Sequence, residues 1–363
     1  MGVLFMMPVW GAASELWMRR MVGQLAGHIR TVAAYQPGED WPADVQTVTL
    51  DDRSESGHST AAAGLLDALR SPDIASALIH YIPLALRYRD VFAAANKPSF
   101  VHCHGYDVTW DLRKPTGERH FPHDYPAQVR RLADHVAFIA NSHCTATKLL
   151  DIGIPPGRIT VKHLGVPVPP AMPKQHAGQE VSILFLGRLV DFKGPDLTIR
   201  AFDLACQRGL RGRLILAGDG PLRPACEDLI ANSPFRDRIA LLGEVSAAAG
   251  DELRQQADLF TAHNQLGPAT GQEEAFGVSI IEAMAAGLPV VSGRSGSLNE
   301  VVGDEAGVLL RPGDVEAHAA ALLQLSQSPL RRQTMGHAGW QRCHERFSLE
   351  REGNQLRAIL GCS

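Results

Sequence analysis

The chain has 363 residues, of which 45% are hydrophobic and 20% are charged, and its formal net charge is −4 at pH 7. These values are ordinary for a soluble globular protein with a large core, and the length predicts two domains. Because the chain has no basic excess, its composition argues against nucleic acid as a partner.

The opening segment MGVLFMMPVW is apolar but lacks the basic start and the cleavage site of a signal peptide, so we expect a first buried strand. No apolar stretch reaches the ~20 residues that a membrane-spanning helix needs. The six cysteines include no C-x-x-C pair, which is typical of reduced thiols. We therefore expect a cytoplasmic protein. Trp17, Arg19 and Arg20 are candidates for a peripheral contact at the inner face of the membrane, although the helical spacing of Trp17, Met21 and Leu25 favours a place in the core.

In the first half of the chain, short apolar runs alternate with helical patterns, as in parallel βαβ units. Gly11 lies at the turn from the first expected strand to a helix that we expect to begin at Ser14. No G-x-G-x-x-G fingerprint with a following acidic residue occurs. We expect buried strands within residues 2–9, 47–50, 76–82, 99–105, 135–142 and 159–165.

The stretch FVHCHGYD places polar residues at the end of one of these strands. We predict that His102 and His104 point to opposite faces of the strand, which argues against a shared metal ion. His104 precedes Gly105 at the carboxyl end, with Asp107 close by, so it is a candidate polar residue of a binding cleft. The alternative is a histidine whose hydrogen bonds are satisfied within the core.

A proline-rich stretch, residues 166–180, has the composition of a linker. After it the pattern resumes, with strands expected within residues 181–189, 212–221, 238–245, 258–265, 288–296 and 306–314. We predict one domain over residues 1–172, a second over residues 173–345 and a C-terminal helical segment over residues 346–363. Open parallel sheets bind ligands at the carboxyl ends of their strands.

Two positive charges follow the first strand of the second half, in FLGRLVDFKG. Arg188 and Lys193 flank a glycine-bounded loop at a carboxyl end, which suits a diphosphate, because guanidinium gives forked donors and ammonium a point charge. The alternative is two surface cations beside a turn. Gly218, in LILAGDGP, indicates a tight turn first and a binding-site position second.

The stretch EEAFGVSIIEAMAAGLPVV contains two carboxylates eight positions apart, Glu274 and Glu282. The pattern predicts a short helix whose N-terminus favours an anion. We therefore include Phe276, Gly277 and Val278 among the residues expected to bind an anionic ligand. Glu282 lies one turn into this helix and is suited to accept the vicinal hydroxyls of a ribose. The alternative is a capping carboxylate on an amphipathic helix. The sequence contains no D-x-D pair, the usual seat of a divalent metal beside a nucleotide diphosphate.

Over nearly its whole length, and most strongly from about residue 183 to 315, the chain resembles the retaining glycosyltransferases of the GT-B fold, in the GT4-type family. The stretch from Glu274 to Glu282 resembles the E-x7-E motif of that family. GRLVDFKG resembles its phosphate-binding segment, and HGYD its N-terminal motif. The ending after FSLE resembles the helix that crosses back onto the N-terminal domain. The resemblance implies an α/β fold of GT-B architecture, with two doubly wound Rossmann-like domains facing each other across a cleft.

The resemblance also implies a nucleotide-diphospho-sugar donor, held by the C-terminal domain, and a saccharide or lipid-linked acceptor on the N-terminal side. Sugar transfer would proceed with retention at the anomeric carbon, in polysaccharide or glycoconjugate biosynthesis. Glu282 would bind the ribose, and Glu274 would contact the donor sugar. Arg188 and Lys193 would neutralise the departing diphosphate, so no metal cofactor is expected. His104 would line the sugar site and stabilise the reacting centre.

Gly11 and Asp107 complete the expected site, on the acceptor side. Two alternatives stay open: a GT-B sugar-nucleotide epimerase or phosphorylase, and a non-catalytic nucleotide-sugar-binding protein. Nucleotide release with and without inorganic phosphate separates a phosphorylase from a transferase. The charged residues that match the family motifs argue against a non-catalytic protein.

Overall fold

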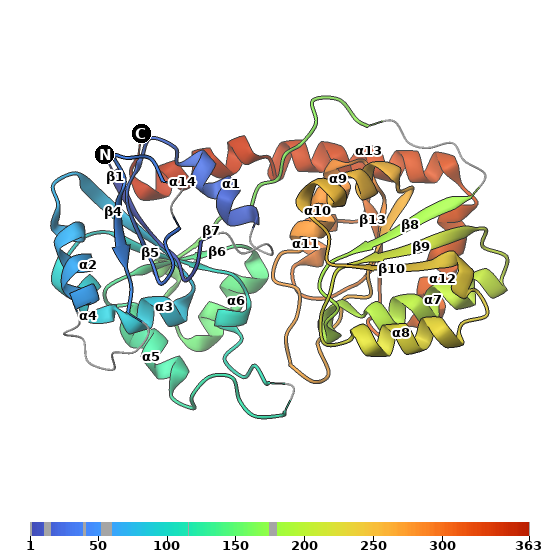
Figure 1. The fold of residues 1–363 in the computed structure, drawn as a ribbon, viewed down its shortest axis with the longest axis horizontal. Coiled ribbons are helices and arrows are strands. Elements are labelled where there is room, and N and C mark those ends of the chain that lie inside the picture. The colour runs from blue at the N-terminus through green and yellow to red at the C-terminus, as the bar shows by residue number, and fades with distance from the viewer. Residues whose placement is uncertain are drawn as a thin grey trace. The chain divides into compact units, whose positions relative to one another are not determined.

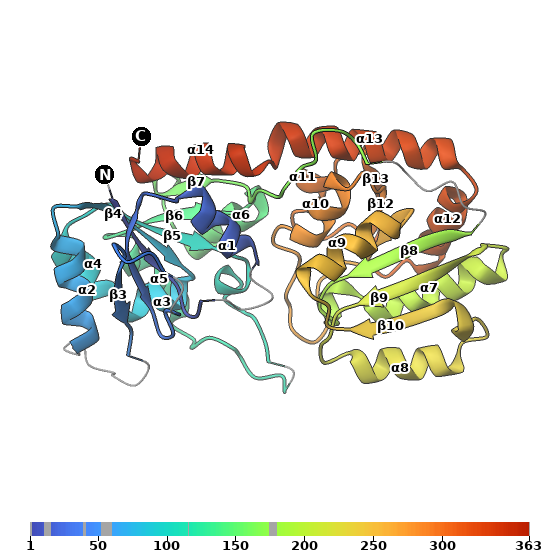
Figure 2. The ribbon, with the colours of Figure 1, turned by 45° about the horizontal axis from the view of Figure 1, so that its top comes forward.

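The computed structural model describes residues 2–10, 16–38, 41–51, 60–114, 116–173 and 180–362. Gly11 and the helix start expected at Ser14 lie outside these described residues. The chain divides into two compact units, shown in Figures 1 and 2. The N-terminal unit comprises Met1–Asp111, Arg119–Gly165 and Leu349–Ser363. The C-terminal unit comprises Leu112–Glu118 and Val166–Ser348.

The N-terminal unit is built on a parallel sheet with the strand order β3-β2-β1-β4-β5-β6-β7. The strands are β1 (Gly2–Met6), β2 (Ile29–Ala34), β3 (Gln46–Thr49), β4 (Ile74–His80), β5 (Ser99–Cys103), β6 (Ala137–Ala140) and β7 (Ile159–Val161). The central strand β1 is fully buried, as expected for a parallel sheet with helices on both faces. The strand order reverses between β1 and β4, and ligands of such sheets bind at the carboxyl ends of the strands at this switch point.

Helices cover the sheet of the N-terminal unit. α1 (Leu16–Gln24) and α14 (Leu349–Leu360) pack against each other, and α14 also contacts β4 (Figure 1). The remaining elements pack in neighbouring pairs: α2 (Thr60–Arg70) with α4 (Arg89–Ala95), and α5 (Tyr125–Leu132) with α3 (Ile82–Arg87) and α6 (His143–Ile152). The short 3-10 turns are η2 (Tyr106–Val108) and η3 (Pro156–Arg158).

A buried ion pair ties α14 to this unit. Lys162, which follows β7, is 1% exposed, and its ammonium donates a hydrogen bond to the Glu352 carboxylate of α14. The other carboxylate oxygen of Glu352 accepts the N–H of Gly165 at 2.9 Å. The end of the chain therefore belongs structurally to the unit that contains its beginning.

The C-terminal unit has a second parallel sheet, with the strand order β10-β9-β8-β11-β12-β13. The strands are β8 (Val181–Leu186), β9 (Gly212–Ala217), β10 (Ile239–Gly243), β11 (Leu259–Thr261), β12 (Val290–Gly293) and β13 (Gly307–Leu310). Here the order reverses between β8 and β11, so the carboxyl ends of these two strands mark the switch point.

Two groups of helices cover this second sheet (Figure 1). On one side lie α7 (Pro195–Gln207), α8 (Arg223–Asn232) and α12 (Val315–Ser326). On the other lie α9 (Ala247–Gln256), α10 (Val278–Ala285), α11 (Leu298–Val302) and α13 (Pro329–Arg346). The 3-10 turns are η4 (Asp191–Lys193) and η5 (Arg236–Arg238). Both units are therefore doubly wound α/β domains, which confirms the predicted fold class.

The predicted strands all occur in the structure, but one observed strand is missing from the prediction. β2, with the sequence IRTVAA, is buried beside β1. Its run mixes Arg30 with alanines that are equally common in helices, so it lacks the apolar continuity of its neighbours. The C-terminal helical segment expected over residues 346–363 agrees with α14, which begins at Leu349.

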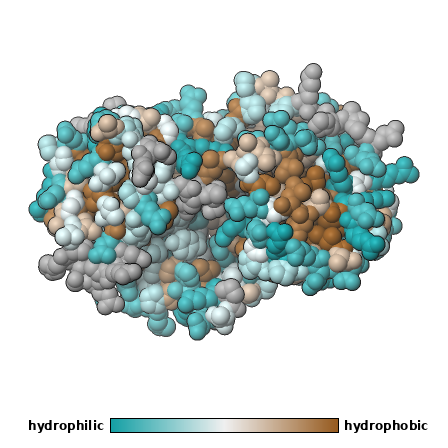
Figure 3. All heavy atoms as spheres, viewed as in Figure 1, coloured by the Kyte–Doolittle hydropathy of each residue, from teal (hydrophilic) through white to brown (hydrophobic). Residues whose placement is uncertain are grey.

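The face drawn in Figure 3 is mostly hydrophilic, with hydrophobic atoms gathered over the C-terminal unit. Trp17, a candidate for membrane contact, is buried at 9% exposure, in agreement with the core alternative. None of the described helices combines the length and apolar character that crossing a bilayer requires. The large apolar side chains that are exposed in the described chain are Val9, Trp110, Leu150, Leu242, Leu266 and Leu330.

Candidate functional site

The C-terminal unit places opposite charges in contact at its switch point. Lys193 ends η4 after β8, and Glu274 lies in the segment between β11 and α10. The Lys193 Nζ atom donates a hydrogen bond to Glu274 Oε2 at 2.7 Å, and the two side chains are only 15% and 10% exposed. The predicted phosphate-binding lysine and the predicted sugar-contacting glutamate therefore share one site.

Two residues that the sequence analysis missed hold the Glu274 carboxylate in place. Asn264 follows β11, and its Nδ2 atom donates to Glu274 Oε2 at 2.9 Å. Ser292, in β12, donates in turn to Asn264 Oδ1 at 3.0 Å, which orients the amide. Asn264 and Ser292 are buried at 1% and 0% exposure, so this network is rigidly packed. Both lie at the ends of strands beside the switch point, and that position was the signal that could have identified them.

The electrostatic surroundings keep Glu274 ionised. Burial by itself would raise the pKa of its carboxyl group. The Lys193 ammonium and its hydrogen bond, the Asn264 amide and the more distant Arg188 guanidinium outweigh burial and lower the pKa below its usual value. Glu274 is therefore an acceptor with a fixed negative charge at neutral pH.

Arg188 contributes a second cation to this region. It is exposed, and its guanidinium lies 5.8 Å from the ring centroid of Phe192. The Lys193 ammonium lies 5.6 Å from the same ring. The buried Phe192 side chain thus supports both cations, and Arg188 remains accessible to an anionic ligand.

Glu282 forms a different ion pair from α10. Its Oε2 atom lies 3.1 Å from Nη1 of Arg254, a buried residue of α9 that also pairs with Asp251. Arg254 supplies the charge that compensates Glu282 in an otherwise apolar helix. The two glutamates of the motif are thus each paired with a basic residue from a separate element.

The other predicted donor-binding residues surround the start of α10 or the end of β9. Gly277 is the N-cap of α10 with φ 82°, a backbone conformation that favours glycine, and Val278 is the first helical residue. The Phe276 ring is 2% exposed and packs against Phe347, so its side chain serves the core. A Cβ atom on Gly218 would lie 2.0 Å from the Gly187 carbonyl oxygen, so this glycine lets two strand ends approach closely.

In the N-terminal unit, Asp107 acts on the backbone. It is fully buried, and Oδ1 accepts the N–H groups of His104 and Gly105 at 2.9 and 3.0 Å. Oδ2 accepts the N–H of Ile82 at 3.1 Å. Asp107 therefore shapes the loop that carries His104, and its carboxylate oxygens are engaged by these donors.

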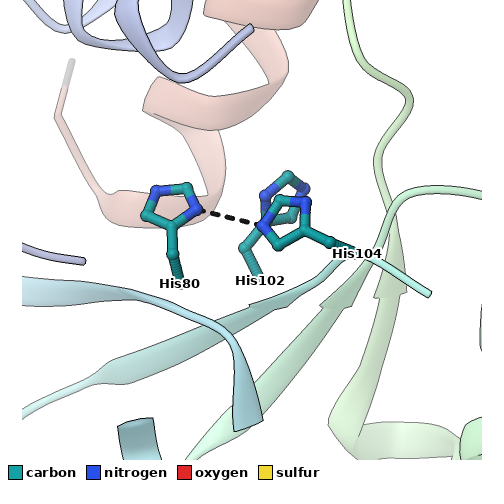
Figure 4. A group of neighbouring side chains, drawn as sticks. All are labelled: His80, His102 and His104. Atoms are coloured by element: carbon teal, nitrogen blue, oxygen red, sulfur yellow. Dashed lines mark hydrogen bonds between the residues drawn. The ribbon is translucent and has the colours of Figure 1, made fainter. Parts of the chain in front are cut away.

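The predicted orientation of His102 and His104 is wrong. Residues two apart along a strand share a face, and the structure brings the two ring centroids within 4.4 Å. His80, at the end of β4, joins them: its Nδ1 atom lies 3.1 Å from His104 Nε2 (Figure 4). The three rings each offer a nitrogen within 4.8 Å of the others. The directions of these side chains therefore do not exclude a shared metal ion.

Comparison with known proteins relates the C-terminal half of the chain to a known family. Residues 172–342 match the model of the family described as glycosyl transferases group 1. This segment, which contains Lys193, Glu274 and Glu282, is what the chain shares with that family.

Two of the most similar relatives are bacterial enzymes. The chain is 31% identical to the amylovoran biosynthesis glycosyltransferase AmsK of Erwinia amylovora over 62% of this chain and 54% of that protein. It is 29% identical to a GDP-mannose-dependent monoacylated α-(1-6)-phosphatidylinositol monomannoside mannosyltransferase of Corynebacterium glutamicum over 48% of this chain and 45% of that protein. The chain spans about half the length of the curated relatives it matches.

Solved structures share the fold across the full length. Anabaena Alr3699/HepE in complex with UDP superposes with a TM-score of 0.81 at 18% identity, covering 100% of both chains. Sucrose-phosphate synthase from Thermosynechococcus elongatus gives a TM-score of 0.74 at 18% identity, again covering 100% of both chains. At this identity the likeness establishes the fold alone, and that fold is the predicted GT-B class.

Proposed function

We propose that this protein is a retaining, metal-independent glycosyltransferase. It moves a sugar from a nucleotide-diphospho-sugar to a saccharide or lipid-linked acceptor in polysaccharide or glycoconjugate biosynthesis. The observation that carries the proposal is the contact between Lys193 and Glu274 at the switch point of the C-terminal sheet. A cation for the diphosphate and a carboxylate for the sugar, which are adjacent parts of one donor, are thereby held a hydrogen bond apart.

In this proposal the donor diphosphate interacts with Lys193 and Arg188. Both cations lie beside the Phe192 ring, and the positive end of the α10 dipole at Gly277 adds a third favourable field. These groups stabilise the negative charge that develops on the leaving diphosphate, which is the role that a divalent metal has in other transferases. Glu282 binds the ribose hydroxyls.

Glu274 is proposed to accept hydrogen bonds from hydroxyl groups of the donor sugar. Its lowered pKa and the Asn264–Ser292 network keep it charged and oriented before the donor binds. Such preorganisation reduces the reorganisation needed in the transition state. Because the carboxylate is engaged by a cation and an amide, we assign it to binding and charge stabilisation and not to nucleophilic attack. Retention then follows from attack by the acceptor hydroxyl on the face that the diphosphate leaves.

The N-terminal unit is proposed to supply His104 and, through the loop that Asp107 holds, the acceptor-side residues. The relatives from Erwinia and Corynebacterium, named for a polysaccharide and a phosphatidylinositol mannoside, support a saccharide or lipid-linked acceptor for this chain.

The test is a transfer assay with purified protein and a panel of UDP- and GDP-sugars, carried out in EDTA with oligosaccharide and polyprenyl-phosphate-linked acceptors. The proposal expects nucleoside diphosphate release that depends on the acceptor, and a product whose anomeric proton shows the configuration of the donor. Release that depends on inorganic phosphate would support a phosphorylase. Release of no nucleotide under any condition, with tight donor binding, would support the non-catalytic alternative.

A further inference from the structure

Three histidines of the N-terminal unit form a group that lies outside the segment matched by the family model. The group, here called the histidine cluster, consists of His80, His102 and His104. His80 and His102 are register partners on the adjacent strands β4 and β5, and His104 follows β5 by one residue (Figure 4). His80 and His102 are 0% exposed, whereas His104 is half-buried.

All three rings are neutral at physiological pH. Burial lowers the pKa of each ring, to about 3 for His80, and the nearby Lys162 ammonium lowers them further. A neutral imidazole carries one proton, so one ring nitrogen donates and the other accepts. The 3.1 Å contact between His80 Nδ1 and His104 Nε2 therefore joins one protonated and one bare nitrogen.

The surroundings decide which nitrogen carries the proton. His80 Nε2 is buried and has no hydrogen-bond partner among the described residues. An unpaired buried N–H group is less tolerated than a bare acceptor. His80 thus keeps Nε2 bare and carries its proton on Nδ1, which donates to His104 Nε2.

We propose that His80 is a positioning residue that fixes the tautomer of His104, so that His104 presents Nδ1–H as a hydrogen-bond donor to a sugar hydroxyl. This deepens the role of His104 in the proposed function and rests on it. Because the bond to His80 occupies Nε2, Nδ1 is the one ring atom of His104 left for a ligand. The ring is also clamped between Trp17 and Tyr81, at centroid distances of 4.2 and 4.7 Å.

A shared metal ion is the competing explanation for the histidine cluster. Charge argues against it. The Asp107 oxygens are engaged by three backbone N–H groups, and the Glu352 carboxylate by Lys162 and the Gly165 N–H. A divalent cation beside these rings would be disfavoured by the Lys162 ammonium, which lowers the pKa of all three rings.

The first readout is the tautomer itself, measured by ¹⁵N NMR on protein labelled at the histidine rings, with His104 assigned from the His104→Asn spectrum. The proposal expects a protonated Nδ1 and a bare Nε2 on His104, and a mixture of tautomers in His80→Phe, which keeps a ring of similar size without the donor. A protonated Nε2 on His104 in the unsubstituted protein would overturn the proposal. This readout does not depend on transferase activity, so it stands apart from the test of the proposed function.

The second readout is kinetic. His80→Phe is expected to lower kcat by about ten- to a hundredfold with a small change in the donor KM, because an oriented donor is lost and the binding cations remain. His80→Asn, whose amide can donate from nearly the position of Nδ1, is expected to recover most of kcat, and the exposed control His135→Phe to match the unsubstituted enzyme. Thermal melts identify any variant that fails to fold. Equal loss in His80→Phe and His80→Asn with intact folding would contradict the proposal.

The third readout addresses the metal. Zn²⁺ is titrated into the dialysed, chelator-treated protein and into His102→Ala. The proposal expects no stoichiometric binding that depends on His102. The opposite result is one equivalent of Zn²⁺ that binds to the unsubstituted protein and is lost in His102→Ala, with shifts at His80 and His104. That result would show that the histidine cluster is a metal site and would overturn the positioning role of His80.

Discussion

Lys193 and Glu274 are separated by 81 residues in the chain, yet their side chains form a 2.7 Å ion pair where the strand order of the C-terminal sheet reverses. Each charge neutralises the other in a partly buried setting. A bound diphosphate would share the ammonium with Glu274, and a bound sugar would share the carboxylate with Lys193. The ion pair therefore holds the ammonium in place for the donor diphosphate and the carboxylate in place for the donor sugar.

Replacing Glu274 is expected to change the rate of sugar transfer and the affinity for nucleotide in different ways. We expect Glu274→Gln to lower kcat by about 10²- to 10³-fold, because a preorganised charge is lost from the reacting region. Nucleotide affinity should be kept or slightly increased, since Lys193 is no longer shared with a carboxylate. Initial rates and calorimetric titration with the nucleoside diphosphate give both quantities. The exposed Glu305→Gln serves as the control. Unchanged kcat would remove Glu274 from the reaction.

Glu282 tests whether the second carboxylate of the motif binds ligand or only pairs with Arg254. We expect Glu282→Ala to weaken nucleotide binding about tenfold through loss of the ribose contact. Stability should fall by about 1–3 kcal/mol, because Arg254 keeps its Asp251 partner. Titration calorimetry and urea unfolding measure the two effects. Global unfolding of the variant, or unaltered nucleotide affinity in a folded one, would favour the purely structural role.

The buried Lys162–Glu352 pair predicts strong coupling between β7 and the C-terminal helix. Each single change, Lys162→Met or Glu352→Leu, is expected to destabilise the N-terminal unit by about 3–5 kcal/mol, because it leaves one uncompensated buried charge. The double variant should regain most of that loss, since two apolar side chains fill the same space. Denaturant unfolding of the four proteins gives the coupling energy. Additive effects of the two changes would contradict the prediction.

Buried histidines predict acid sensitivity in both units. Burial lowers the pKa of His80 in the N-terminal unit and of His318 in the C-terminal unit to about 3, whereas the unfolded chain protonates histidine below about pH 6.5. Between these values the unfolded state binds more protons, so the free energy of unfolding is unaffected above pH 6.5 and falls as the pH is lowered toward 3. Lowering the pH from 6.5 to 5 should cost about 1.6 kcal/mol for each of these two histidines.

Urea unfolding at a series of pH values checks this dependence, and His318→Gln should show a shallower slope for the C-terminal unit. A free energy of unfolding that stays constant from pH 7 to pH 5 would contradict the assignment of neutral buried rings. The His318 ring forms hydrogen bonds with Thr261 at 2.7 Å and with His263 at 2.8 Å. The variant therefore also tests whether these hydrogen bonds require a neutral His318 ring.

Sequence periodicity was sufficient to predict the two doubly wound sheets, because strands buried on both faces are continuous apolar runs. It also placed the charged motif residues near the ends of these strands. The supporting residues were not predictable in the same way. Asn264 and Arg254 are single polar residues whose partners are 10 and 28 positions away, and only the folded sheet brings them together. His80 was overlooked because the apolar run ALIHYI around it indicates a strand and not a site.

The error on His102 and His104 has a different origin. It came from applying the alternation of strand side chains to residues two apart, which in fact lie on one face. The correct geometry turns two separate histidines into a cluster with His80, and that cluster is the basis of the tautomer proposal.

The central claim is that Lys193 and Arg188, and not a metal ion, hold the diphosphate of the donor. Titration calorimetry of UDP and GDP into the protein, in EDTA and in Mg²⁺, measures this directly, with Lys193→Met, Arg188→Met and the surface control Lys114→Met as variants. The account predicts equal affinity in EDTA and Mg²⁺ for the better nucleotide, a loss of about tenfold or more in each site variant and none in the control. Binding that disappears in EDTA, or that persists unchanged when both cations are removed together, would contradict it.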